Sequence, residues 1–331
     1  MAASASSSFI TTEYDASSTA TDVVAHRDLT GLRAIVTGGG AGIGLATARA
    51  LAAAGAEVTL AVRNTTAGAD AARSISEGAP ARVCTAELDL ADLDSIRRFT
   101  DAWTGPVHLL INNAGIVTSG LERTRHGWEL QLATNHMGHF ALATRLRRAL
   151  EAGAADRDGA RVVSVSSTAL MRANVDFDDL QFERRPYDPQ IAYAQSKTAN
   201  SLFAVELTRR WRDAGVIANA VNPGGVASGL QRNFTPEQKA SLDAAEAAGT
   251  FRYKTADQGA ATTLVAAVHP AFAHTGGHYL DDCREAYTVP NDARLADHPH
   301  GVKEWALDPG AAERLWAVSS DLVVAAGLST H

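Results

Sequence analysis

Tyr193 and Lys197 are the two residues of this sequence whose types and spacing best suit proton transfer. Four residues apart on a helix, they share one face, with their Cβ atoms about 5–6 Å apart. A phenol has an ordinary pKa of about 10 and is a poor acid–base group at neutral pH, but a neighbouring ammonium favours the phenolate and lowers that pKa. The pair therefore predicts a general acid–base device. The same spacing also occurs as an ordinary surface pair on a helix, so other segments must decide between the two interpretations.

A glycine-rich turn near the start of the chain supports the chemical interpretation. Residues 33–37 are predicted to form a buried strand that runs into the glycines of 38–44, and an alanine-rich helix follows over about 45–54. Strand, glycine turn and helix form the context of a dinucleotide site, because the glycines let the backbone approach a pyrophosphate that binds at the helix N-terminus. A plain turn is the alternative, and the flanking elements favour the cofactor site.

Two further motifs complete a set that resembles the short-chain dehydrogenase/reductase family: Asn112-Asn113-Ala114-Gly115 and Ser166-Ser167, each after an apolar strand. The resemblance covers roughly residues 30–279, and the glycines at positions 38, 42 and 44 follow that family's spacing. The long segment 168–192 is similar to the branch that contains retinol dehydrogenases and WW-domain oxidoreductases. Strands that alternate with helices along the chain imply an α/β fold, one doubly wound parallel sheet (a Rossmann fold) in a single domain.

The resemblance also implies a role for each of four residues. Tyr193 would be the general acid–base, and Lys197 its electrostatic partner and the anchor of the cofactor's ribose. Ser167 would hold the substrate oxygen by a hydrogen bond, and Asn135 would hold a water that connects the lysine to solvent. No G-x-S-x-G elbow surrounds Ser167, so it is not predicted to be a covalent nucleophile.

The same resemblance implies where the cofactor lies. Asp89 and Leu90 would border the adenine, residues 113–115 the adenosine half, and residues 222–228 the nicotinamide. Asp89 can also satisfy local backbone donors near a helix start, and both roles are compatible. The expected cofactor contacts are Gly38, Gly42, Ile43, Gly44, Arg63, Asn64, Asp89, Leu90, Asn113, Ala114, Gly115, Tyr193, Lys197, Pro223, Gly224, Val226 and Ser228.

The end of the second predicted strand favours NADP(H) over NAD(H). Val62 stands where NAD-binding relatives place an acidic residue on the ribose hydroxyls, and Arg63 follows it. No carboxylate is there to repel a 2′-phosphate, and a guanidinium is in place to bind one. The alternative is that Arg63 is a solvated loop charge and NAD(H) is accepted as well.

Composition excludes several other classes of protein. The chain has 331 residues, 46% of them hydrophobic, and a net charge of −7, which argues against a general nucleic-acid binder. Its two cysteines offer neither a disulfide framework nor a thiolate metal cluster. No membrane span and no secretory signal are expected, and we predict a cytoplasmic protein.

No metal site is predicted from the histidines. His136 and His139 stand three residues apart on a predicted helix, but no cysteine or carboxylate lies at ligand spacing. Buried, hydrogen-bonded histidines are the expected alternative. His298 and His300, on either side of Pro299, are likewise not assigned to a metal.

The sequence predicts the following organisation. Residues 1–29 form a flexible or surface-draped extension, and residues 30–331 form the dinucleotide-binding and catalytic domain. Within it, about 231–249 is expected to be a helical lid over the substrate, and 281–331 a C-terminal segment with a helix near 309–322. The expected apolar walls of the substrate site are Met171, Phe177, Leu180, Tyr187 and Phe234.

These observations predict NADP(H)-dependent interconversion of a carbonyl compound and an alcohol, on a lipophilic small molecule. Two alternatives stay open: a redox-neutral epimerisation through a transient ketone, and a dinucleotide-binding sensor without enzymatic activity. The resemblance also implies self-association into a homodimer or homotetramer through helices at 128–150 and 193–214. The second of these helices carries more apolar surface than packing on one sheet needs. The residues of that surface are Leu202, Phe203, Val205 and Leu207.

Overall fold

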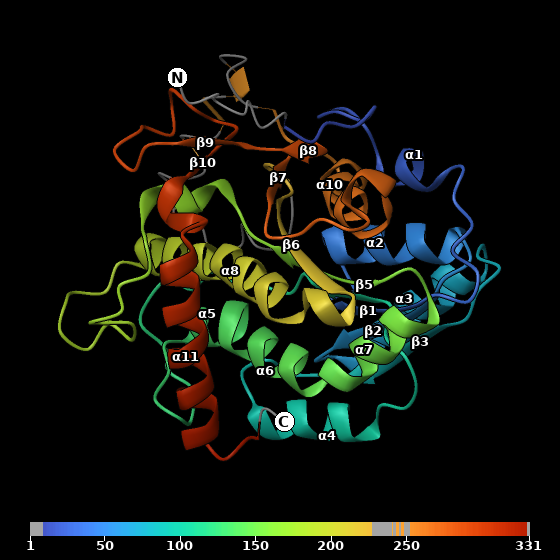
Figure 1. Ribbon diagram of the computed structural model, residues 1–331, viewed down its shortest axis with the longest axis horizontal. Helices are drawn as coiled ribbons and strands as arrows, with labels where there is room; N and C mark the ends of the chain where they lie inside the picture. The colour runs from blue at the N-terminus through green and yellow to red at the C-terminus, as the bar shows by residue number, and fades with distance from the viewer. Residues whose placement is uncertain (1–8, 227–239, 241–242, 245, 248–251, 330–331) are drawn as a thin grey trace.

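The computed structural model describes residues 9–226, 240, 243–244, 246–247 and 252–329 (Figure 1). Its centre is an eight-stranded sheet of order β3-β2-β1-β4-β5-β6-β7-β8, in which β8 alone is antiparallel to its neighbour. The predicted doubly wound α/β fold is therefore confirmed. The strands are β1 Arg33–Thr37, β2 Glu57–Val62, β3 Val83–Glu87, β4 Leu109–Asn112, β5 Ala160–Val165, β6 Val216–Asn222, β7 Tyr279–Asp281 and β8 Arg284–Glu285.

The central strands are apolar along their whole length because helices cover both faces of the sheet. Neighbouring residues of β1 show this alternation: Ile35 packs into the core on one face, and Ala34 and Val36 into the core on the other. Strands β1, β2 and β3 lie side by side in this order toward one edge of the sheet. The next strand, β4, pairs with β1 on its other side, so the strand order reverses there. Ligands of such sheets bind at the carboxyl ends of the strands, where the order reverses.

Each face of the sheet has its own layer of helices (Figure 1). One face is covered by α2 Gly42–Ala53, α3 Thr65–Ser76 and α10 Ala256–Val268. The other is covered by α4 Leu93–Ala102, α6 Gly138–Arg145, α7 Arg147–Asp156 and α8 Pro189–Trp211. Short 3₁₀ turns lie at η2 Thr168–Arg172, η3 Arg212–Ala214, η5 Pro270–Phe272 and η6 Glu304–Ala306.

The helix expected over 128–150 is not continuous. It begins as α5 Leu130–Leu132, widens into the π-helical segment η1 Ala133–Met137, and continues as α6 and α7. The residue after the π segment, Gly138, has to be a glycine, because a Cβ there would collide with the backbone of Leu90. A π segment shifts the hydrogen-bond register by one residue and is often found at functional sites. Here it contains Asn135.

The described part of the N-terminal extension is draped over the domain surface. Two hydrogen bonds tie Ile10 to Glu285 of β8. The Ile10 N–H donates to the Glu285 carboxylate at 2.9 Å, and the Glu285 N–H donates to the Ile10 carbonyl at 2.9 Å. Helix α1 Ala20–Val24, which the sequence did not indicate, packs against α10 and α2. Its start is fixed by a capping box between Thr19 and Asp22.

The C-terminal segment covers the face that the sequence assigned to self-association. Helix α11 Pro309–Ala325 runs beside α8 (Figure 1), and Trp316 stacks on Phe203 with ring centroids 5.9 Å apart. Leu202, Phe203 and Leu207 are buried within the chain, and Val205 is partly buried against the same core. The apolar surface on which the sequence argument for pairing relied is therefore largely covered by the chain itself, and self-association stays a prediction. A small parallel sheet, β9 Tyr287–Val289 and β10 Gly301–Lys303, lies just before α11.

Two predicted features lie wholly or mostly outside the described residues. They are Ser228 and the expected lid at 231–249, of which residues 240, 243–244 and 246–247 are described. Among the described residues, every helix is too short or too polar to cross a membrane.

Candidate active site

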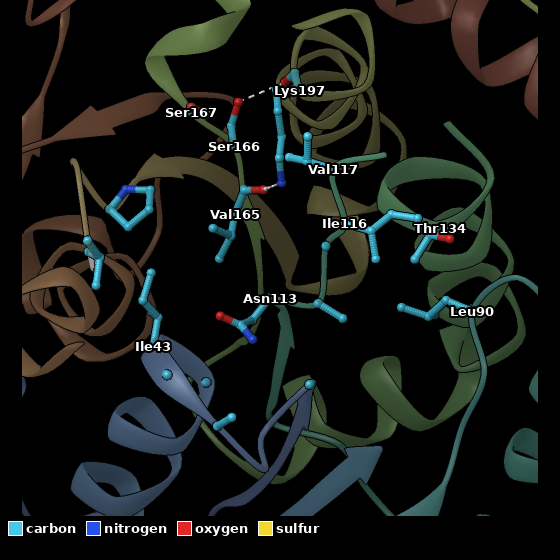
Figure 2. A pocket seen from close by; sticks show the side chains of 18 of the residues that line it. Ile43, Leu90, Asn113, Ile116, Val117, Thr134, Val165, Ser166, Ser167 and Lys197 are labelled. Carbon is cyan, nitrogen blue, oxygen red and sulfur yellow. Dashed lines mark hydrogen bonds between the residues drawn. The ribbon is translucent and has the colours of Figure 1, made fainter. Parts of the chain in front are cut away.

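A cavity of about 1530 Å³ opens at the carboxyl ends of the strands (Figure 2). The loops after β1 through β6 all contribute to its walls. Most of the residues predicted from motifs line it, and Asn135 lies behind the wall. Those lining residues are Gly38, Gly42, Ile43, Gly44, Arg63, Asn64, Asp89, Leu90, Asn113, Ala114, Gly115, Ser167, Tyr193, Lys197, Pro223, Gly224 and Val226.

The glycine turn after β1 has the shape that a pyrophosphate needs. Gly38 and Gly42 have φ values of 65° and 54°, in the left-handed region that favours glycine. A Cβ on Gly44 would collide with the Asn113 side chain and the Gly38 backbone. Ala41, which precedes α2, gives that helix no side-chain cap. The first turn of α2 therefore offers backbone N–H groups and the positive end of the helix dipole to an anion.

The loop after β2 brings the predicted phosphate-binding residue to the cavity. Arg63 is exposed, and it forms no ion pair with the part of the chain that the structure describes. Asn64 starts α3, because its side-chain oxygen accepts a hydrogen bond of 3.0 Å from the Ala67 N–H. Arg63 is thus held beside a helix N-terminus with its charge free for a ligand.

Asp89 performs one of the two roles that the sequence left open and stays available for the other. Its carboxylate accepts a hydrogen bond from the Ala91 N–H at 2.9 Å, which is the local backbone role. The residue also lines the cavity together with Leu88 and Leu90. The position is therefore compatible with contact to the adenine.

Helix α8 places the tyrosine and lysine on the cavity side. Asp188 caps its N-terminus and Pro189 occupies the first turn, so the helix begins one turn before Tyr193. The Lys197 side chain extends to the Val165 carbonyl, to which Nζ donates at 2.9 Å (Figure 2). Its Nζ lies 5.5 Å from the Tyr193 ring centroid. The Ser166 hydroxyl donates to the Lys197 carbonyl at 2.7 Å and fixes α8 on β5.

The pKa values of this pair differ from the sequence expectation. Burial raises the pKa of Tyr193 to about 12, against a smaller lowering by a hydrogen bond with Ser167. Burial also lowers the pKa of Lys197 to about 8. The predicted lowering of the phenol pKa is therefore wrong for the protein groups alone, because burial of the phenol raises its pKa by more than the hydrogen bond with Ser167 lowers it. The Tyr193 ring is only partly covered and borders the cavity. The increase in its pKa therefore depends on which molecule fills the cavity.

Asn135 has its side chain fully committed to the protein. The carboxamide oxygen accepts from the Ile116 N–H at 2.8 Å, and the amide donates to the Ile116 carbonyl at 3.1 Å and to the Ser196 hydroxyl at 2.9 Å. Gly115 separates it from the cavity, and a Cβ there would lie 3.4 Å from both the Asn135 Oδ1 and the Lys197 Nζ. Asn135 therefore lies behind Gly115, on the side of the wall that is close to the Lys197 Nζ.

The expected apolar walls were placed wrongly. Met171 and Leu180 are buried in the core, Phe177 packs against it, and Phe234 lies outside the described residues. The Tyr187 hydroxyl is held by Glu129, Thr118 and Gln131 at 2.8–3.0 Å, away from the cavity. The residues that line the cavity instead, and that motif reasoning missed, include Ile116, Val117, Thr134, Arg172, Gln190, Tyr253 and Leu295.

Sequence proximity could have indicated two of these residues. Gln190 precedes Tyr193 by about one helical turn, and Arg172 ends the short 3₁₀ helix that starts beside Ser167. The Arg172 guanidinium donates to the Gln190 side-chain oxygen. Leu295 belongs to the C-terminal segment, where no motif could have marked it.

The histidines are buried and hydrogen-bonded, as predicted. His136 bonds the Ser319 hydroxyl at 2.9 Å, and His139 lies between the Asn135 carbonyl and Thr37. Burial lowers the pKa of His136 to about 3 and that of His139 to about 4.

One group of possible metal ligands is already engaged by contacts within the protein. Asp281, Asp282 and His300 lie within 4.8 Å of one another. The Lys254 Nζ contacts Asp282 at 2.5 Å, and His300 bonds Asp281 at 2.8 Å. The second carboxylate oxygen of Asp281 accepts from Asn222 at 2.9 Å.

Comparisons with known proteins agree with this geometry. A family model described as short chain dehydrogenase matches residues 33–239. A protein of Streptomyces antibioticus named "Probable oxidoreductase" is 45% identical over 305 residues, which are 90% of this chain and 100% of that protein. Retinol dehydrogenase 12 of Homo sapiens is 36% identical over 309 residues, 89% of this chain and 87% of that protein. The solved Pseudomonas aeruginosa RhlG/NADP active-site complex has a TM-score of 0.63 and 25% identity, and the match covers 77% of this chain and 95% of that one.

Proposed function

Because this chain belongs to the short-chain dehydrogenase/reductase family and is an oxidoreductase of that family, we propose that it interconverts a carbonyl compound and an alcohol with NADP(H). The observation that carries the proposal is the meeting of Ser167, Tyr193 and Lys197 at one cavity that also contains the glycine turn. Asn135, the fourth residue with a predicted catalytic role, lies close to this cavity behind Gly115.

The chain's own residues would handle the proton. The bound nicotinamide supplies or accepts the hydride at the substrate carbon. In reduction, Tyr193 gives its phenolic proton to the substrate oxygen, and the Ser167 hydroxyl donates a hydrogen bond to the same oxygen. With a pKa of about 12, the phenol carries its proton at neutral pH and is ready to act as the acid. Oxidation requires the phenolate, which the Lys197 charge would stabilise only once cofactor and substrate fill the cavity.

Arg63 supports the choice of NADP(H) within this proposal. A guanidinium with no described ion-pair partner, next to the N-terminus of α3, suits the 2′-phosphate that distinguishes NADP(H) from NAD(H). The RhlG/NADP complex shows that a structural relative binds this cofactor. NAD(H) is the alternative cofactor, and the affinities of an Arg63 variant for the two cofactors distinguish between them.

A lipophilic small molecule is the proposed substrate class. Ile116, Val117 and Leu295 give the cavity apolar walls, although they are not the residues that the sequence suggested. Arg172 and Gln190 add polar groups to the same cavity, so a carboxylate-bearing substrate is the competing class. A cytoplasmic location also belongs to the proposal, and it is supported by the unpaired state of Cys84 and Cys283.

Turnover of a ketone panel tests the proposal. Purified protein would be given NADPH and a series of apolar ketones, each with a carboxylated analogue. We expect NADPH consumption matched one for one by alcohol, with the apolar member of each pair preferred. A strong preference for carboxylated ketones would contradict the substrate class. A product with one inverted stereocentre and no net loss of NADPH would instead indicate epimerisation.

A further inference from the structure

His139 is a buried histidine of α6 that lies behind the catalytic residues. Its side chain is not among those that line the cavity, and the residue is 2% exposed. Its Nδ1 lies 2.9 Å from the Asn135 carbonyl oxygen, and its Nε2 lies 2.9 Å from the Thr37 hydroxyl at the end of β1. One imidazole therefore connects the π segment that holds Asn135 with the strand that leads into the glycine turn.

The partners of His139 determine which ring nitrogen carries the proton. A carbonyl oxygen can only accept, so Nδ1 must be the donor to Asn135. Burial keeps the ring neutral at physiological pH, which leaves Nε2 as an acceptor. The charged group that acts on it is Lys197 on α8, which lowers its pKa further. The neighbouring His136 is neutral as well, because burial lowers its pKa to about 3. The Thr37 hydroxyl must then donate to Nε2.

The remaining bonds of Thr37 agree with that assignment. Its oxygen accepts backbone N–H groups from Asn113 at 2.9 Å and Ala114 at 3.0 Å, which fills both lone pairs. Its own proton could otherwise reach only the Ile111 carbonyl, at the longer distance of 3.3 Å. The Asn113–Ala114 turn, which lines the cavity, is thus tied through Thr37 to His139.

The connection continues from Asn135 to the catalytic helix. The Asn135 amide donates to the Ser196 hydroxyl at 2.9 Å, and this hydroxyl donates to the Tyr193 carbonyl at 2.7 Å. Two sets of hydrogen bonds, joined through the covalent bonds of Asn135, therefore lead from the cofactor-side turn to the backbone of the proposed acid–base residue. His139 stands in this connection between Thr37 and Asn135.

We propose that His139, as a neutral imidazole protonated on Nδ1, is a positioning residue for turnover that fixes the Asn135 carbonyl and, through Thr37, the Asn113–Ala114 turn. The inference goes beyond the proposed function, because it concerns a residue that touches neither substrate nor cofactor. Only those of its tests that measure turnover depend on the proposed function.

The first test is independent of activity. ¹⁵N NMR of the histidine rings in the intact protein should show His139 with its proton on Nδ1 and none on Nε2, unchanged between about pH 5.5 and pH 8. A proton on Nε2, or a titration of this ring within that range, would overturn the proposal. This result stands even if no ketone of the panel is turned over.

The second test uses His136 as a matched control, because it is equally buried on the same helical segment but bonds Ser319 of α11. His139→Phe removes both hydrogen bonds of the imidazole and should lower kcat about tenfold or more, with KM and NADPH affinity within about threefold of wild type. His139→Asn, which retains a donor near the Nδ1 position, should recover part of kcat. His136→Asn should keep kcat near wild type even where it lowers the melting temperature.

Variants of Thr37 test whether its hydroxyl and His139 act together. Thr37→Ser keeps the hydroxyl and should keep kcat, whereas Thr37→Val removes it and should lower kcat. The double variant His139→Asn with Thr37→Val should lose less than the sum of the two single losses, because both break the same connection. Unchanged kcat in folded His139→Phe or His139→Asn would contradict the positioning role. If His139→Phe fails to fold, the Asn and Thr37 variants and the NMR measurement still decide.

Discussion

At the scale of single residues, Arg63 carries the prediction of cofactor choice. Replacing it with Ala should weaken NADPH about ten- to hundred-fold and leave NADH nearly unchanged, because only NADPH has a 2′-phosphate and a charge-assisted contact of about 1.5–3 kcal/mol would be lost. Fluorescence titration of both cofactors measures this. Arg73→Ala, an exposed arginine farther along α3, is the control. Equal weakening of both cofactors would mean that Arg63 does not bind the phosphate.

Lys197 predicts a pH dependence of stability. Its pKa falls from 10.5 unfolded to about 8 folded, so between these values the unfolded chain binds more protons and stability rises with pH. The contribution of Lys197 should become more favourable by about 2 kcal/mol from pH 8 to pH 10. Urea unfolding of wild type and Lys197→Met isolates it, since other groups cancel in the difference. A difference that stays constant over this range would contradict the burial of a titrating Lys197.

Single residues also show what the sequence could and could not predict. The glycines, Tyr193 and Lys197 were predictable because their chemistry requires particular types at particular spacings. The walls of the cavity were not, because Met171 and Leu180 have the same apolar character whether they face a ligand or the core. The raised pKa of Tyr193 was missed because spacing does not give the burial of the phenol.

At the scale of elements, the same limit applies to α8. The apolar pattern of Leu202, Phe203 and Leu207 requires a partner, but it is identical whether that partner is a second chain or α11. The π segment around Asn135 was also not predictable, since its residues are compatible with an ordinary helix. Tertiary packing decided both features.

Removing α11 should expose the covered face. A chain that ends at Leu307 would leave Phe203 and its neighbours in water, so we expect it to melt at a lower temperature and to associate at micromolar concentration. Light scattering of the truncated and intact chains at equal concentration measures this. The control is Val324→Ser, at a half-exposed position of α11. A truncated chain with unchanged mass and melting temperature would contradict the covering role of α11. The oligomeric state of the intact chain stays a prediction, and the same light-scattering measurement decides it.

At the scale of the whole molecule, the order of the strands explains why distant motifs meet. Placing β4 and β5 on the far side of β1 brings the turns after residues 37, 112 and 165 to one edge, and α8 returns across them with Tyr193 and Lys197. The sequence predicted this architecture because the motifs are tied to strand ends. It did not predict how α1 and the C-terminal segment cover the outside, since neither carries a motif.

The measurement that tests the central claim most directly is turnover and cofactor affinity of Tyr193→Phe. The change removes the phenolic proton but keeps the ring, so the protein should remain folded and bind NADPH almost normally while kcat falls about a hundred-fold or more. Ser167→Ala should also lose turnover with little change in NADPH affinity, and Lys197→Ala should weaken NADPH as well. If Tyr193→Phe keeps more than about half of the wild-type rate on an accepted ketone, Tyr193 is not the proton donor and the proposed mechanism is wrong.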